Sequence, residues 1–152
     1  MEVTRFTDDG SLVTDFGEEF LVVCPKCSDL AVVTRPPIES EESNKLLTAP
    51  RKLTCSNCTY VRGWKSGSIL IGADVDWYFR QTLWLQIPCC GKTLWAYNLR
   101  HLEYLENYVR AKLRSRIPNR KSVASRLPTW MKKAGNRQEI LKAIGKLKAT
   151  VK

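Results

Sequence analysis

The chain has a single histidine, His101, and no uninterrupted apolar run that approaches eighteen residues. Because a membrane-spanning helix needs about 20 mostly apolar residues, no transmembrane helix is expected. The sequence also has no glycine-rich phosphate loop and no nucleophile–base pair, and Asp74 and Asp76 have no base or open metal position nearby. These absences argue against an enzyme. The N-terminal stretch is acidic and does not resemble a signal peptide, so we expect a cytoplasmic protein that does not enter a membrane.

Six cysteines stand out against this background, and four of them form two Cys-x-x-Cys pairs. Twenty-seven residues separate Cys24 and Cys27 from Cys55 and Cys58. Zinc binds four thiolates at tetrahedral corners, and each short turn supplies two of them. Because four thiolates close the coordination shell, the spacing predicts one structural Zn²⁺ ion without a catalytic water. Disulfides would need a secreted chain, and a redox pair would need a single motif beside a βαβ pattern.

Short runs of β-branched and aromatic residues flank both cysteine pairs. Residues 20–23 and 30–34 enclose the first pair, and residues 52–54 and 59–64 enclose the second. The stretch 19–65 therefore resembles the zinc-ribbon superfamily, as found in transcription factor IIB, RNA polymerase subunits and primosomal helicases. The whole chain also resembles small bacterial proteins that carry such a ribbon. The resemblance implies metal binding by the four cysteines, and it does not choose between nucleic-acid binding, protein binding and scaffolding.

The segment 83–97 weakly repeats the pattern of residues 20–34. In both, an apolar strand leads into a turn that contains proline and cysteine, and a second apolar strand follows. The repeat predicts that Leu83–Ile87 and Thr93–Tyr97 pair as antiparallel strands around a knuckle-like turn. We expect this third hairpin to extend the ribbon sheet.

The remaining cysteines, Cys89 and Cys90, are adjacent and have only His101 as a further candidate ligand. Adjacent cysteines seldom bind one ion together, and three candidates do not close a zinc shell. We therefore expect small, partly buried thiols and a histidine packed against the third hairpin. A second metal site and a vicinal redox pair are the alternatives.

The C-terminal part of the chain shows helical periodicity. Asn98 is a favoured N-cap residue, and apolar residues at spacings of three and four predict a helix from Leu99 to Ser115. A second helix is expected at 128–134, starting with proline and ending at glycine. A third is expected at 137–150, with a capping box formed by an asparagine and a glutamate three residues later.

These patterns predict an α+β protein of three parts. An acidic segment spans residues 1–18, and a small antiparallel zinc ribbon extended by the third hairpin spans 19–97. A basic helical region spans 98–152. Proline-led, acidic residues from Pro36 onward form an exposed loop within the ribbon.

Charge is distributed unevenly along the chain, which carries a net charge of +10. The net charge is −6 over residues 1–50, +5 over 51–100 and +11 over 101–152. A chain polarised in this way suits a phosphate backbone or an acidic protein partner. A basic helical face that is merely solvated is the simpler alternative.

We therefore expect a nucleic-acid-binding accessory or regulatory protein of bacterial or phage type, with DNA and RNA both open as ligands. The alternative is an adaptor that docks on a polymerase, a helicase or a defence complex, and the oligomeric state is left open. Affinity for phosphates falls steeply with salt, whereas an apolar docking face responds much less. The expected nucleic-acid contacts are Arg110, Arg114, Arg116, Arg120, Lys121, Arg126, Lys132, Lys133, Lys142 and Lys146, with Trp64 and Trp130 as candidates for base stacking.

Overall fold

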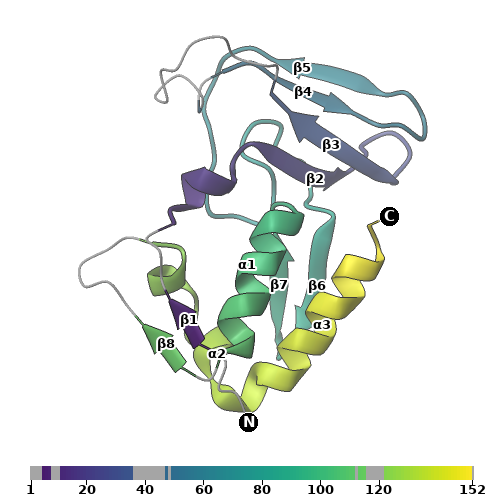
Figure 1. Ribbon diagram of the computed structural model, residues 1–152. Coiled ribbons are helices and arrows are strands. Elements are labelled where there is room, and N and C mark those ends of the chain that lie inside the picture. Colours follow the sequence, from purple (N-terminus) through teal and green to yellow (C-terminus); the bar gives the residue numbers. More distant parts are fainter. Residues whose placement is uncertain are drawn as a thin grey trace. The chain divides into compact units, whose positions relative to one another are not determined.

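The structure is a computed structural model, and it describes residues 5–7, 11–35, 47, 49–111, 113–115 and 122–151. The chain folds as two compact units, whose elements are labelled in Figure 1. The sheet unit comprises residues 17–85 and 96–98, and the helical unit comprises residues 1–16, 86–95 and 99–152. Most of the third hairpin thus falls in the helical unit, whereas the sequence-based division groups it with the ribbon.

Four strands form an antiparallel sheet in the sheet unit, in the order β2-β3-β4-β5 (Figure 1). They are β2 (Glu19–Val23), β3 (Leu30–Thr34), β4 (Arg51–Thr54) and β5 (Val61–Trp64). Each strand coincides with a run that flanks a cysteine pair, because β-branched and apolar residues favour a pleated, half-buried surface. The expected α+β fold class, with antiparallel strands followed by C-terminal helices, is confirmed.

An aromatic cluster fills the core of the sheet unit. Phe20, Trp77 and Tyr97 are fully buried and meet edge to face, with ring centroids 5.0–5.5 Å apart. Such pairs contribute about 0.5–1.5 kcal/mol each beyond the burial of their area. Gly17 lies so close to this cluster that a Cβ atom there would come within 2.3 Å of the Trp77 ring. The cluster therefore requires glycine at the entrance to β2.

The third hairpin is formed by β6 (Leu85–Cys89) and β7 (Lys92–Ala96), as the sequence repeat predicts. Its turn is Cys90-Gly91, in which both residues have positive φ, 54° and 74°. This combination is typical of a type I′ turn, whose twist matches that of the flanking strands. The turn is therefore a tight two-residue turn, and the expectation of a knuckle-like turn is wrong.

The hairpin is also a two-stranded sheet of its own and adds no strand to the larger sheet. Residues just before and just after it border β2, where the Leu21 N–H donates to the Tyr97 carbonyl at 2.9 Å. Leu83 forms an isolated bridge with Val22, and the Trp84 N–H donates to the Leu21 carbonyl at 2.9 Å. Pro88 lies within β6 and has no N–H to donate, so this strand is unsuited to a central place in a sheet.

In the part of the helical unit that the structure describes, there are three α-helices and short 3₁₀ turns at Val13–Phe16, Ala124–Arg126 and Ala134–Asn136. The sequence predicts a first helix that continues to residue 115, but α1 (Leu99–Arg110) ends five residues earlier. Leu113–Ser115 instead forms β8, which pairs in parallel with β1 (Arg5–Thr7) (Figure 1). The backbone groups of this segment therefore pair with a strand near the N-terminus, although the local sequence favours a helix there.

The remaining helices are α2 (Thr129–Lys132) and α3 (Arg137–Ala149). The bounds of α3 agree closely with the prediction, whereas α2 is a single turn. The expected capping box is absent, because the side chain of Asn136 makes no cap hydrogen bond. Its amide donates to the Trp130 carbonyl at 2.8 Å, and Glu139 accepts a hydrogen bond from the Cys90 thiol at 3.0 Å.

The core of the helical unit lies between α1 and α3, which pack against each other (Figure 1). Leu102, Leu105 and Val109 of α1 are buried, and so are Ile140 and Ile144 of α3. Within each helix these buried residues lie three or four positions apart, as helical periodicity predicts. None of the helices in the described segments is long and apolar enough to cross a membrane.

Candidate metal centre

The two Cys-x-x-Cys pairs occupy turns of the same construction. Each first cysteine follows a strand, and the residue after each second cysteine, Ser28 or Thr59, has a positive φ of 66° or 63°. The Ser28 N–H donates to the Cys24 carbonyl at 2.9 Å, and the Thr59 N–H donates to the Cys55 carbonyl at 2.9 Å. The left-handed residue turns the chain back towards its strand and leaves both thiols of each pair on the inside of the turn.

The four thiols converge from the two turns. The ligand atoms of Cys24, Cys27, Cys55 and Cys58 all lie within 4.8 Å of one another. Across the two pairs, Cys24 Sγ lies 3.6 Å from Cys58 Sγ, and Cys27 Sγ lies 3.6 Å from Cys55 Sγ. A disulfide would bring the sulfurs to about 2.05 Å, and all four cysteines are free. Zn–S bonds of about 2.3 Å at tetrahedral angles place sulfurs roughly 3.8 Å apart, so this donor set fits zinc.

Hydrogen bonds from the turns prepare some of these thiols for deprotonation. The Asn57 side-chain amide and the Asp29 N–H lower the pKa of Cys27 to about 6. Burial alone would raise the pKa of Cys24, but the N–H groups of Cys27 and Lys26 lower it. Burial raises the pKa of Cys58 to about 12. Because a coordinated thiol is deprotonated outright, a cation would supply the charge stabilisation that Cys58 lacks.

The structure separates the predicted phosphate contacts into several groups. Arg126, Lys133, Lys142 and Lys146 are exposed, and Lys132 is half-buried. Arg116, Arg120 and Lys121 lie outside the described residues, as does the side chain of Arg114, whose backbone belongs to β8.

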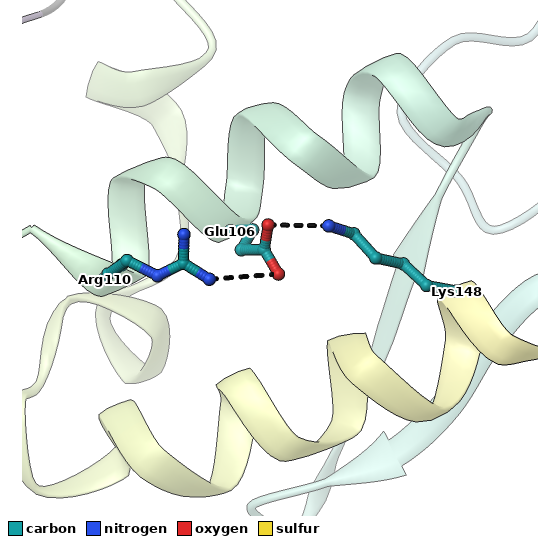
Figure 2. Close-up of polar contacts among 3 residues, drawn as sticks. All are labelled: Glu106, Arg110 and Lys148. Carbon is teal, nitrogen blue, oxygen red and sulfur yellow. Dashed lines mark hydrogen bonds and ion pairs between the residues drawn. The ribbon is translucent and has the colours of Figure 1, made fainter.

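Arg110 takes part in an ion-pair network with Glu106, although it is also exposed (Figure 2). Glu106 lies 3.4 Å from Arg110 on the same helix and 2.7 Å from Lys148 on α3. The carboxylate thus links α1 to α3, as Figure 2 shows. The Glu106 side chain is only 13% exposed, but Arg110 and Lys148 are 52% and 40% exposed, so solvent screens both pairs and each contributes about 1 kcal/mol or less. Arg110 has an internal partner in addition to any phosphate.

The two tryptophans predicted to stack on bases differ in their surroundings. Trp64 is half-buried and already packs edge to face against Tyr78, with centroids 4.8 Å apart. Trp130 is half-buried in the helical unit, where it lines a pocket together with Trp95.

The structure does not bring Cys89, Cys90 and His101 together as a metal site. Among the described residues, the four-cysteine cluster alone meets the geometry for an ion. Cys90 donates to a glutamate, and His101 is buried against the rings of Phe16 and Trp95, at 5.0 and 6.2 Å. Burial, with a smaller contribution from the charge of Arg100, lowers the pKa of His101 to about 4. The expected packing of His101 over the third hairpin is confirmed.

Two buried charged residues of the sheet unit have structural roles that the sequence analysis missed. The Asp76 carboxylate accepts hydrogen bonds from the N–H groups of Tyr78, Phe79 and Gln81 at 2.6–2.9 Å. Aspartate often folds a turn in this way, so the local sequence contained a signal for Asp76. The Arg51 guanidinium lies over the Tyr78 ring and donates to the Gly17 carbonyl at 2.6 Å. No local pattern indicates that contact, because Gly17 is distant in sequence.

In comparisons with known proteins, no family model, no curated protein and no solved structure matched the chain.

Proposed function

We propose that Cys24, Cys27, Cys55 and Cys58 bind one Zn²⁺ ion and that the sheet unit is a zinc ribbon. The convergence of four thiols from two matching turns supports this proposal, because soft thiolates in a tetrahedral set select zinc over the hard cations. Metal analysis of protein purified without added metal should find one zinc per chain. A double variant with Cys24→Ser and Cys55→Ser should contain none, and undiminished zinc in that variant would contradict the proposal.

We further propose that the protein is a nucleic-acid-binding accessory or regulatory factor whose helical unit contacts phosphates. The observation that supports this function is the pair of exposed lysines on α3, Lys142 and Lys146, which lie one helical turn apart. Exposed Lys133 lies just before α3, and Arg126 lies before α2. Cations arranged without an obvious base-reading element suit sequence-independent contact with phosphates.

Other cations of α3 differ from this lysine pair, because they contact α1 within the protein. Arg137 uses its Nε to donate to the Val109 carbonyl at 3.0 Å, and Lys148 pairs with Glu106. These two side chains connect α3 to α1. Lys142 and Lys146 point away from that contact, and α3 has a single acidic side chain, Glu139, to offset them. The net positive charge of α3 is therefore directed at solvent and at any anionic partner.

Fluorescence anisotropy with single- and double-stranded DNA and RNA across a salt series tests the function. We expect micromolar or tighter binding at low salt and a steep fall in affinity as salt rises. The double variant Lys142→Ala with Lys146→Ala should reduce the slope of log K against log salt by roughly 1.4 to 1.8. Lys26→Ala with Lys52→Ala is the matched control, because it removes two exposed lysines from the sheet unit. Absence of binding at low salt would refute the function.

Protein docking is the second candidate, and the edge of the sheet unit favours it. Strand β5 is the last strand of the four-stranded sheet, and Val61 on it is 56% exposed. An accessible edge strand can pair with an extended peptide from a partner. Binding of this kind should change little with salt, and Val61→Lys should weaken it while leaving nucleic-acid affinity intact.

A further inference from the structure

The helical unit contains a pocket with a volume of about 310 Å³. Its walls come from β7, α1, α2 and the two residues that lead into α2. Apolar side chains make up most of the lining, and the indoles of Trp95 and Trp130 are both half-buried. The lining residues are Lys92, Thr93, Leu94, Trp95, His101, Leu105, Leu127, Pro128, Trp130 and Met131.

The size and lining of the pocket suit one planar ring system. Ligand pockets usually measure about 300–1,000 Å³, so this one lies at the small end of the range. Tryptophan faces stack well on aromatic rings, and the hydroxyl of the exposed Thr93 can hydrogen-bond with a ring edge.

The charge around the pocket is positive. Lys92 is exposed and belongs to the lining, Arg126 directly precedes Leu127, and Lys132 and Lys133 directly follow Met131. No acidic side chain lines the pocket among the residues that the structure describes. An uncharged aromatic molecule would contact only the walls of the pocket. A nucleic-acid strand would use both the walls, through a base, and the surrounding cations, through its phosphates.

We propose that this pocket receives one unstacked base of a single-stranded nucleic acid, while the surrounding cations bind the phosphates beside it. The proposal rests on the proposed nucleic-acid function and gives it a strand preference. Single strands suit such a site, because their bases are free to leave the stack and lie against aromatic side chains. A base in a duplex would first have to be unpaired, so double-stranded ligands bind through the phosphates alone.

The first experiment uses the unaltered protein and compares oligothymidylate with an abasic strand of equal length. The two ligands carry the same phosphates, so contacts to the backbone alone would give equal affinities. We expect the base-containing strand to bind roughly 5- to 100-fold more tightly, as stacking of one base predicts. Equal affinities would overturn the pocket proposal and leave the phosphate-binding function standing. Binding to neither strand would overturn both.

The second experiment locates the base. Trp130→Ala should remove most of the preference for the base-containing strand, and Trp130→Phe should retain part of it, because phenylalanine keeps an aromatic face. Trp64→Ala is the matched control in the sheet unit and should preserve the preference. An undiminished preference in Trp130→Ala would overturn the proposal, provided that circular dichroism finds the variant folded.

A measurement without substitutions covers the case in which Trp130→Ala does not fold. The indole N–H resonances of the tryptophans can be followed by NMR while a thymidine pentanucleotide is added to the unaltered protein. We expect the largest shifts at Trp95 and Trp130 and small shifts at Trp64 and Trp77. Largest shifts at Trp64 would place the base in the sheet unit and would overturn the proposal.

Discussion

Three hairpin turns of this protein carry cysteines, but only two of them contribute thiols to the four-cysteine cluster. At each of the two paired-cysteine turns, six residues connect the strands, 24–29 in the first and 55–60 in the second. Two residues, Cys90 and Gly91, connect the strands of the third hairpin. The longer turns have room to fold both thiols inward, whereas the I′ turn places its two residues at the tip. Connection length, more than the presence of cysteine and proline, therefore decides whether a hairpin can hold a metal.

The difference extends to what stabilises each hairpin. The paired-cysteine turns enclose four thiols that would repel one another once deprotonated, so a cation bound as proposed above would stabilise them. The third hairpin depends on packing, because Leu94 is buried and Trp95 lies against His101. Removing the metal and disturbing the histidine should therefore affect different parts of the molecule.

Removal of the metal should have the largest effect. Chelation, or the variant Cys55→Ser, should unfold the four-stranded sheet, because binding free energy at a structural zinc site is also folding free energy. Amide hydrogen exchange in β2–β5 measures this loss of protection. Cys90→Ser is the matched control and should leave exchange in the same strands unchanged. Full protection of β2–β5 in the chelated protein would show that packing alone keeps the four-stranded sheet folded without a metal.

Protonation of His101 should have the next largest effect, and it should appear in the helical unit. The pKa is about 4 in the folded protein and about 6.5 in the unfolded chain, so the unfolded chain binds more protons between these values. The stability that depends on neutral His101 is therefore fully present above pH 6.5 and is lost as the pH falls towards 4. Between pH 7 and pH 5 the loss should be about 2 kcal/mol.

Hydrogen exchange in α1 at the two pH values, corrected for intrinsic rates, measures this loss. His101→Phe keeps an aromatic ring against Phe16 and Trp95 but cannot be protonated, so it should remove this part of the pH dependence. An equal pH dependence in that variant would assign the effect to another group.

At turn positions with left-handed backbone, removing a glycine should lower the stability and introducing a glycine should raise it. Gly91 has a φ of 74° with open space around its Cα, so Gly91→Ala should cost about 1 kcal/mol through backbone strain alone. Thr59 is β-branched at a φ of 63°, so Thr59→Gly should stabilise the metal-bound sheet by up to about 1 kcal/mol. Denaturant unfolding of the zinc-loaded variants measures whether each substitution raises or lowers the free energy of unfolding. Changes of the same sign in both variants would show that the left-handed backbone does not control stability at these turns.

The smallest effect is expected from Cys90→Asn, which creates an Asn-Gly sequence at the tip of the third hairpin. Asparagine tolerates positive φ better than cysteine, and Asn-Gly is strongly preferred in I′ turns. The gain in stability should be a few tenths of a kcal/mol, reduced by the lost hydrogen bond to Glu139. Thermal unfolding should detect a small rise in Tm. A marked fall would indicate that the Cys90 thiol has a structural role that this turn geometry does not explain.

The sequence by itself determined the features that depend on spacing within a short stretch. The two Cys-x-x-Cys pairs predicted the thiol cluster, because each turn positions its own two sulfurs and the flanking runs form the strands that align the turns. The stripes of α1 and α3 were equally predictable, since apolar residues three and four apart share one face of a helix.

The tertiary structure decided the features that depend on partners distant in sequence. α1 ends at Arg110, and the residues beyond it pair with β1 near the N-terminus, although the local pattern favours a longer helix. Glu106 takes Lys148 as a partner across two helices, and the pocket gathers Trp95 and Trp130 from different elements. In each case the free energy comes from a contact that forms only when remote segments meet, so no window of the sequence contains the signal.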